Sequence, residues 1–197
     1  MKKAYHFLKD NMCGGYGNEP PWQVGEQREI KGKLGLCAVG YHASPCWYDA
    51  LGYAKGNIAC KVELSGEILK DTDKYCARSR KLISSRNAER VLREWGCDCA
   101  ERALKKTGVT DERSWNAIKV ARLYSKGEAT KKELTAARAA AWAARDAAWA
   151  AREAARAAEI KWQKRRLNAM MEKLFEETEQ ATIKVGKSND TDNGGNQ

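Results

Sequence analysis

The sequence predicts an α+β fold, in which a small β-rich N-terminal domain precedes an all-helical C-terminal region with one long alanine-rich helix. Three observations predict it. All three prolines and most of the 16 glycines precede residue 85, whereas alanine, arginine, glutamate and lysine dominate after it. Residues 58–68 alternate apolar and polar side chains with a period of two, which is typical of a half-buried strand. Beyond residue 85, apolar side chains recur every three or four positions, which is typical of amphipathic helices.

In the N-terminal part we expect short strands at residues 2–8 and 22–30, a glycine-rich turn at 13–17 and a short helix at 49–54. The clearest strand is 58–68, because its two faces differ most in polarity. Its expected core face holds Val62, Leu64 and Ile68, and its expected solvent face holds Lys61, Glu63 and Glu67.

The helical part carries start and stop signals for two helices before the long one. Ser84 or Ser85 is expected to cap the first helix, because a hydroxyl oxygen can accept a bond from an unpaired backbone amide. Gly108 is expected to end that helix, since glycine readily adopts the left-handed conformation of a helix terminus. Thr110 is expected to cap the second helix, and Gly127 to end it.

A third start signal lies at Thr130 and Glu133, which have the spacing of a capping box. No glycine or proline follows before Gly186, so one helix is expected from Lys131 to about Glu179. Such a helix would be roughly 75 Å long at about 1.5 Å per residue.

The polar, glycine-containing segment after this helix is expected to be disordered. The predicted organisation is therefore an α+β domain over 1–85, an alanine-rich helical domain over 86–185 and a tail over 186–197.

The long helix contains a seven-residue repeat of alanine, arginine and tryptophan over residues 137–157. Trp142 and Trp149 each follow an arginine by four residues, a spacing that allows cation–π contacts on adjacent turns. Both tryptophans are expected to pack back on the earlier helices, which carry Trp95, Trp115 and Ile118. The alternative is that they anchor a partner or a second copy of the chain.

Composition excludes several classes of protein. Lys and Arg number 36 against 26 Asp and Glu, so the formal net charge is +10. No run of 18 apolar residues is present, and the N-terminus has no apolar stretch typical of a secretory signal. We therefore expect a soluble, basic, cytoplasmic protein with no membrane partner.

Seven cysteines in such a protein are expected to be reduced thiols rather than disulfides. Cys37, His42 and Cys46 lie close together, and Cys97 and Cys99 form a second pair. No Cys-x-x-Cys spacing occurs, so a metal site is not favoured and small buried side chains are the simpler interpretation.

Four N-terminal segments share a pattern with known proteins: residues 4–9, Cys37–Ser44, 49–51 and Val62–Ile68. The pattern is a strand, a Cys-x-x-Gly-aromatic-His-Ala-x box, a short helix and a Val-x-x-Ser-Gly-Glu strand. Over about residues 4–85 the chain thereby resembles a domain family of uncharacterised function that is common in phage and prophage proteins.

The helical part has a second resemblance, carried by Cys97–Leu104, Asp111–Arg113, Ala117–Ile118, Gly127–Glu128 and the alanine–arginine repeat. These segments are similar to alanine-rich helical proteins designated immunity proteins. The resemblance implies binding and neutralisation of another macromolecule.

An enzyme is the alternative. The box, with Ala50 and Tyr53 after it, resembles the Gly-x-aromatic-x-Ala/Ser segment of ADP-ribosyltransferase-like folds. That resemblance implies a nicotinamide pocket formed by His6, His42 and Tyr53, a later Glu such as Glu67, and NAD as the cofactor. No phosphate-binding loop, nucleophile elbow or zinc-protease motif is present, so no other cofactor is expected.

Basic residues gather in two stretches, which suit nucleic-acid phosphates or an acidic protein partner. Solvated helix faces are the simpler interpretation, because acidic residues alternate with basic ones elsewhere. The first stretch comprises Arg78, Arg80, Lys81, Arg86, Arg90 and Arg93, and the second Lys161, Lys164, Arg165, Arg166 and Lys173.

Together these patterns favour a phage-type accessory protein that binds and inhibits or modulates a bacterial, defence-related macromolecule. The expected partner is a host or defence-system protein or ribonucleoprotein, bound through the helical and basic surfaces. The alternatives are the ADP-ribosyltransferase-like enzyme and a non-specific nucleic-acid-binding protein.

Overall fold

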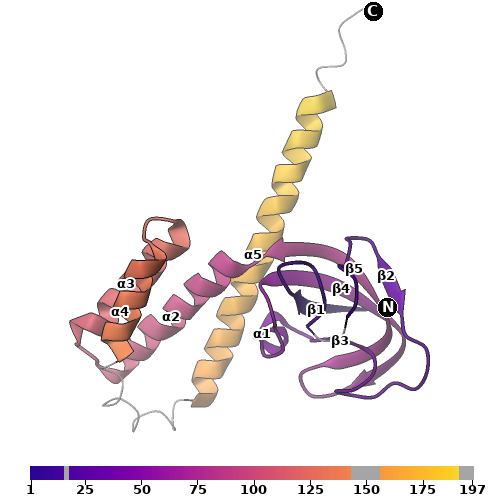
Figure 1. Cartoon of the computed structure of the whole chain (residues 1–197), viewed down its shortest axis with the longest axis horizontal. Coiled ribbons are helices and arrows are strands. Elements are labelled where there is room, and N and C mark those ends of the chain that lie inside the picture. Colours follow the sequence, from indigo (N-terminus) through magenta and orange to yellow (C-terminus); the bar gives the residue numbers. More distant parts are fainter. Residues whose placement is uncertain (16–17, 143–155, 191–197) are drawn as a thin grey trace, which may run out of the picture.

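The protein has an antiparallel β-sheet followed by helices, which confirms the predicted α+β class (Figure 1). The computed structural model describes residues 1–15, 18–142 and 156–190. The strands are β1 (Lys2–Leu8), β2 (Gln27–Glu29), β3 (Tyr41–Ala43), β4 (Ile58–Lys70) and β5 (Tyr75–Asn87). The helices are α1 (Trp47–Leu51), α2 (Glu89–Thr107), α3 (Glu112–Lys126), α4 (Lys131–Trp142) and α5 (Arg156–Asp190).

The sheet curls until its two ends meet. Its order is β1-β4-β5-β2, and β3 pairs with β5 beside β2. Ser44, just after β3, exchanges two backbone hydrogen bonds of 2.9 and 2.8 Å with Tyr5 of β1. The long β4–β5 ladder changes register between Lys61 and Val62 and again between Ser65 and Ile68. Such bulges bend a ladder and increase its twist, which lets this hairpin wrap around an interior.

Strand alternation divides the sheet into an inner and an outer face. On β1, Ala4 and Leu8 belong to the inner core, whereas Phe7 belongs to the outer one. The inner core also receives Val62 and Leu64, as the period of two predicted, and Trp22 and Tyr41 complete it. The sheet thus encloses one apolar cluster and presents its other face to the helices.

The outer face of the sheet is covered by α1 and α5 (Figure 1). Leu167, Met171 and Phe175 recur every four residues along α5 and are almost fully buried there. The Phe175 ring stacks on Trp47 of α1, with the ring centroids 5.3 Å apart. Burial of this apolar stripe holds the C-terminal helix against the N-terminal sheet.

A carboxylate on the same helix ties the contact together. Glu172 accepts a hydrogen bond from Trp47 Nε1 at 3.0 Å and forms an ion pair with Lys61 Nζ at 2.7 Å. Asn168 accepts a further bond from the Trp47 backbone amide at 3.1 Å. Burial alone would raise the pKa of Glu172, but the bonds from Lys61 and Trp47 lower it overall.

Several predicted helix ends are confirmed. Gly108 and Gly127 adopt left-handed backbones, with φ of 64° and 79°, and end α2 and α3. The capping box begins α4: the Glu133 amide donates to Thr130 Oγ1 at 3.2 Å, and the Thr130 amide donates to Glu133 Oε2 at 2.7 Å.

Two predicted caps are wrong. Ser84 and Ser85 do not cap α2, because β5 continues through both and pairs them with Lys61 and Cys60. Asn87 instead accepts a bond from the first backbone amide of α2. The cap of α3 is Asp111 rather than Thr110, because α3 begins at Glu112 and the Asp111 carboxylate accepts a bond from the Arg113 amide at 2.9 Å.

Other boundaries also differ from the expectation. Only residues 27–29 of the expected strand 22–30 pair as a strand, and the short helix lies at 47–51 rather than 49–54. The expected domain boundary at residue 85 falls inside β5.

The long-helix prediction is met only in parts. Residues 131–142 and 156–179 are helical, and the intervening 143–155 lie outside the described residues. α5 continues past Gly186 to Asp190, so the expected tail does not begin at residue 186. A glycine inside a helix costs only about 1 kcal/mol, which is too little to end a helix this long.

Across the described ranges, no helix combines the length and the apolarity that crossing a bilayer requires.

Replacing Phe175 with alanine should lower the free energy of unfolding by about 3–5 kcal/mol, because the ring is buried between Trp47 and the sheet. The matched control is Ile160→Ala, since Ile160 lies on the same helix and is 39% exposed. Urea unfolding followed by tryptophan fluorescence compares the two variants. Equal losses would show that α5 is not anchored through Phe175.

Candidate functional site

The most unusual group of polar side chains lies around Cys37, in the loop that precedes β3. Cys37 is exposed and has a φ of 63°, a left-handed conformation rare for residues other than glycine. Its backbone amide donates to His42 Nε2 at 3.1 Å, and its Sγ accepts a bond from Lys74 Nζ at 2.9 Å. Gly40 allows this loop to lie close to β5, because a Cβ there would collide with Cys76 Sγ.

Lys74 is held in place by a second set of contacts, in the turn between β4 and β5. Its ammonium lies 3.4 Å from Tyr53 Oη and 4.9 Å from the centre of the Tyr53 ring. Tyr53 Oη donates in turn to Asp73 Oδ2 at 2.8 Å, and Asp71 lies 3.9 Å from the ammonium. The bonds with Cys37 and Tyr53 raise the pKa of Lys74, so its cation is stabilised.

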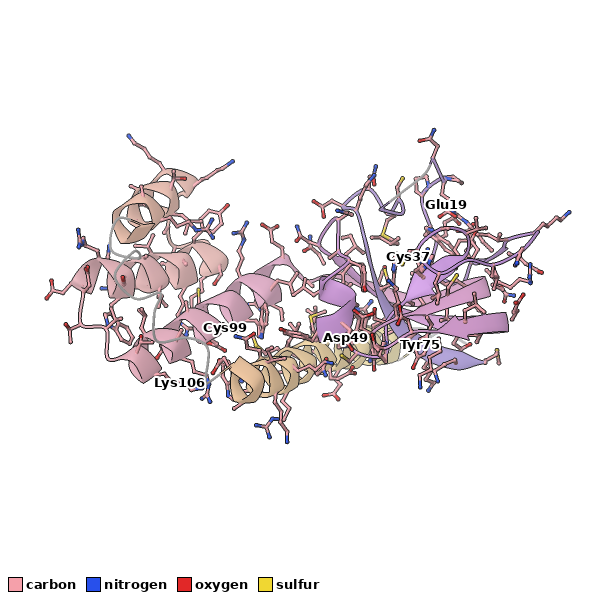
Figure 2. All side chains as sticks on the ribbon, turned by 90° about the horizontal axis from the view of Figure 1, so that it is seen from below. Glu19, Cys37, Asp49, Tyr75, Cys99 and Lys106 are labelled. Atoms are coloured by element: carbon pink, nitrogen blue, oxygen red, sulfur yellow. The ribbon has the colours of Figure 1, made fainter. Side chains whose placement is uncertain are left out.

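We name Cys37, His42, Tyr53, Asp73 and Lys74 the Cys37 cluster. Three segments far apart in sequence build it: β3 with the loop before it, the turn after α1 and the β4–β5 turn. Figure 2 shows Cys37 on the sheet part of the molecule, well away from Cys99 and Lys106 on the helical part.

His42 is the most constrained member of the cluster. Burial lowers its pKa, a backbone hydrogen bond with Gly40 opposes that shift, and the cations of Lys74 and Arg80 add to it. The imidazole is therefore neutral at neutral pH, and Nε2 accepts the Cys37 amide. The His42 ring thus bonds with the backbone of both Gly40 and Cys37 and holds the loop before β3 in place. His42 therefore acts here as a positioning residue.

His6 lies on the inner face of β1, opposite Cys60 of β4. Its Nε2 is buried without a hydrogen-bond partner. Burial, followed by the positive charge of Arg80 and the neighbouring His42, lowers its pKa well below the usual 6.5. His6 is therefore neutral in the folded protein.

Arg80 is the cation beside both histidines and is itself only 4% exposed. It donates to the His42 carbonyl at 3.1 Å and lies 4.4 Å from the centre of the Trp22 ring. Burial lowers its pKa to about 10, although the charge of Glu19 opposes this shift. Aromatic rings and one carbonyl thus replace water around a buried guanidinium.

The candidate enzyme residues are therefore brought together only in part. His42 and Tyr53 share the Cys37 cluster. His6 is not a member of it and lies in the inner core, where Arg80 and His42 are its neighbours. Glu67 lies outside the cluster and pairs with Arg78 at 2.6 Å. Lys74 and Asp73 were not predicted, since turn residues this far from Cys37 leave no local pattern that joins them.

The two groups of cysteines that were weighed as metal ligands, and not favoured, have the following surroundings. His42 accepts the Cys37 amide, and Cys46 Sγ donates to Asp49 Oδ2 at 3.0 Å. Burial raises the pKa of the Cys97 thiol and raises that of Cys99 to about 11. Within the part of the chain that the structure describes, no group of three or more His, Cys, Asp or Glu is arranged to hold a metal.

The first basic stretch does not form one patch, because strand alternation and ion pairs separate its members. Arg78 binds Glu67 and the carbonyls of Ile30 and Gly32, and Arg80 is buried. Among the remaining members, Arg86 packs over the Phe175 ring, Arg93 pairs with Glu89, and Lys81 and Arg90 are exposed.

The second basic stretch serves packing in a similar way. Lys164 pairs with Asp49 at 2.7 Å, and Arg166 pairs with Asp98 at 2.8 Å. Arg165 and Lys161 are exposed. The predicted contacts of Trp142 and Trp149 concern side chains outside the described part of the structure.

Sequence reasoning did not reveal a groove between α2, α3 and α4, with a volume of about 520 Å³. α3 has no fully buried residue, and each of its apolar residues is half-buried. Glu89, Arg93 and Arg138 supply charged atoms to the groove. Its apolar lining comprises Leu92, Gly96, Cys97, Ala100, Ala117, Ile118, Ala121 and Leu134.

A second hollow, of about 450 Å³ between α2 and α5, is lined mainly by charged side chains, several of which form ion pairs. Arg122 binds Asp98 and Glu101 at 2.9 and 2.7 Å, and Arg102 binds Glu159 at 3.0 Å. These pairs tie α2 to α3 and to α5, so this hollow is part of the packing between helices.

Comparison with known proteins finds a match for the N-terminal part of the chain. Residues 2–94 match the model of a domain of unknown function, DUF7666. The match spans the whole sheet, α1 and the first turn of α2, and it therefore includes the Cys37 cluster. No curated protein and no solved structure matches the chain. The groove between α2, α3 and α4 lies only partly within this match, because Asn57, Glu89, Leu92 and Arg93 precede residue 95 and the rest of its lining follows it.

Acidification should destabilise the protein through His6, because the unfolded chain binds a proton near pH 6.5 that the folded imidazole binds only at much lower pH. As the pH falls below 6.5, His6 should lower the free energy of unfolding by up to about 1.4 kcal/mol per pH unit. Urea unfolding between pH 7.5 and about pH 5 measures this slope.

His6→Gln should flatten the slope. His42→Gln should reduce it less, since the pKa of His42 is lowered to a smaller extent. An unchanged slope in His6→Gln would contradict the assignment of a neutral, buried His6.

Proposed function

We propose that the protein acts by binding, and that the groove between α2, α3 and α4 receives an α-helical segment of another protein. The observation that carries this proposal is α3, a helix of 15 residues without a fully buried side chain. A helix that packs only within its own chain normally buries its apolar stripe. The half-buried stripe of α3 therefore supports a surface that a partner completes.

The lining of the groove favours a helix as the occupant. Gly96 and Ala100 on α2 and Ala117 and Ala121 on α3 each recur at four-residue spacing, and both pairs line the groove. Small residues on two neighbouring helices leave room for a third helix to approach closely. Leu92, Ile118 and Leu134 supply the larger apolar contacts.

Charge favours an acidic partner. Over residues 89–142, Lys and Arg outnumber Asp and Glu by 12 to 8. Arg90 and Lys119 are exposed next to groove residues in the chain, and Arg138 lines the groove itself. An amphipathic helix with acidic residues beside its apolar stripe would meet both features.

The resemblances seen in the sequence support a biological setting for this binding. Similarity of the N-terminal part to phage and prophage domains, and of the helical part to immunity proteins, supports a cytoplasmic bacterial target that the protein inhibits or modulates. The placement of His42 supports binding over ADP-ribosyl transfer, since its Nε2 already accepts the Cys37 amide. The dispersed basic residues favour a protein partner over nucleic-acid phosphates.

Ala100→Arg should abolish partner binding, because Ala100 is exposed and lines the groove, so an arginine there fills it without disturbing a core. The matched control is Ala136→Arg, an exposed position of α4 outside the groove lining. Immobilised wild type and both variants are incubated with bacterial lysate, with and without nuclease treatment, and the captured proteins are identified by mass spectrometry.

A supporting result is a protein that wild type and Ala136→Arg both retain and that Ala100→Arg loses. The purified partner should then protect backbone amides of α3 from hydrogen exchange. Equal capture by both variants would exclude the groove. Capture that nuclease treatment abolishes would favour the nucleic-acid alternative.

A further inference from the structure

Cys37 differs from the other six cysteines, all of which lie in the described residues. Cys60, Cys76 and Cys97 are buried, and burial raises their thiol pKa. Cys37 alone is exposed. A reagent from solution can therefore reach Cys37 more readily than any other cysteine in the chain.

The ammonium of Lys74 is aimed at this sulfur. Nζ lies 2.9 Å from Sγ, and the Lys74 side chain is only 12% exposed, so contacts rather than solvent fix its position. Tyr53 and Asp71 hold the same ammonium from other directions. The thiolate is the nucleophilic form of cysteine, and this ammonium lies within hydrogen-bond distance of the sulfur that would attack.

We propose that Cys37 and Lys74 form a peroxide-driven covalent crosslink, a sulfenamide between Sγ and Nζ. In the first step, the Cys37 thiolate attacks hydrogen peroxide, so that an S–O bond forms and the O–O bond breaks. The Lys74 ammonium gives its proton to the departing hydroxide, which leaves as water. Sulfur is oxidised by two electrons, and the peroxide oxygen is reduced.

The first step leaves the two groups needed for the second. Cys37 is now a sulfenic acid, whose sulfur is electrophilic, and Lys74 is a neutral amine beside it. Nζ attacks Sγ, an N–S bond forms, the S–O bond breaks, and the released hydroxide takes an N–H proton to become water. In total, one thiol, one amine and one peroxide give one sulfenamide and two waters.

The crosslink would join the loop before β3 to the β4–β5 turn. β3 is the strand whose end meets β1 and closes the sheet. A covalent tie here should therefore stabilise the closed sheet, and a thiol reductant should reverse it by attacking sulfur and releasing the Lys74 amine. The reaction is independent of the groove on the helical part.

The test treats the full chain with hydrogen peroxide and follows its intact mass and its labelling by dimedone, which traps sulfenic acids. Wild type should lose about 2 Da, resist dimedone and recover its mass with dithiothreitol. Peptide mapping should recover Cys37 linked to Lys74. Cys37→Ser should show none of these changes.

Three variants separate this crosslink from other oxidation products. Lys74→Arg keeps the cation but lacks the amine, so it should gain about 16 Da and react with dimedone at Cys37. Lys74→Met should be oxidised more slowly and form no crosslink. Cys76→Ser should behave as wild type, because Cys76 donates to the carbonyls of Val39 and Gly35 and has no role in the reaction.

Two results would overturn the proposal. A disulfide between Cys37 and Cys76 would also lower the mass by about 2 Da, but it would disappear in Cys76→Ser. A wild-type protein that reacts with dimedone at Cys37 as fully as Lys74→Arg would show that the amine does not capture the sulfenic acid.

Discussion

The contact between Glu172 and Trp47 determines how the two parts of this molecule fit together. Glu172 binds the indole nitrogen of α1 and the ammonium of Lys61 on β4, while Phe175, one helical turn along α5, stacks on the indole ring. One turn of α5 thereby engages α1 and the sheet at once. A charged pair at the edge of an apolar cluster fixes position more than it adds stability, because desolvation offsets much of its attraction. The buried apolar stripe of α5 supplies most of the energy of its contact with the sheet, and the bonds of Glu172 fix the position of α5 along the sheet.

This anchor explains why the helical part has an open groove. α2 packs against α5 on one side, where Trp95 Nε1 donates to the Gln163 carbonyl at 3.1 Å. Its other side meets α3, which in turn packs on α4. Because α5 packs on the sheet, the described residues of α3 pack mainly on α2 and α4, and those of α4 mainly on α3. Three short helices enclose less apolar surface than four, and among the described residues the groove is a part that they leave open.

The sequence predicted local structure well where one local force decides it. The period of two in 58–68 gave the right inner face, since Val62 and Leu64 belong to the inner core. The expected solvent face is wrong at Lys61, because α5 covers that face and Lys61 pairs there with Glu172. The left-handed glycines gave the right helix ends. The cap at Ser84 or Ser85 failed because the ladder with β4 outweighs a local hydroxyl cap, so β5 continues to Asn87.

The candidate site was harder to predict because its chemistry depends on long-range closure of the sheet. His42 and Tyr53 could be singled out from their motif, but Lys74 reaches Cys37 only after β5 pairs with β3 and β4. The first basic stretch failed as a patch for a related reason. In a strand, adjacent residues point to opposite faces, so Arg80 enters the core while Lys81 faces solvent.

The two functional regions proposed here lie at opposite ends of one continuous element. β5 begins at Tyr75, one residue after Lys74, and ends at Asn87, two residues before α2 and its groove residue Glu89. Ala88 between them is fully buried, and its amide donates to the Asn57 carbonyl at 2.8 Å. Because Asn57 also lines the groove, the first turn of α2 is fastened to the sheet at the point where a partner would sit. The sheet thus forms the base of the proposed binding surface, and the proposed crosslink between Cys37 and Lys74 would tie that base closed at its other end.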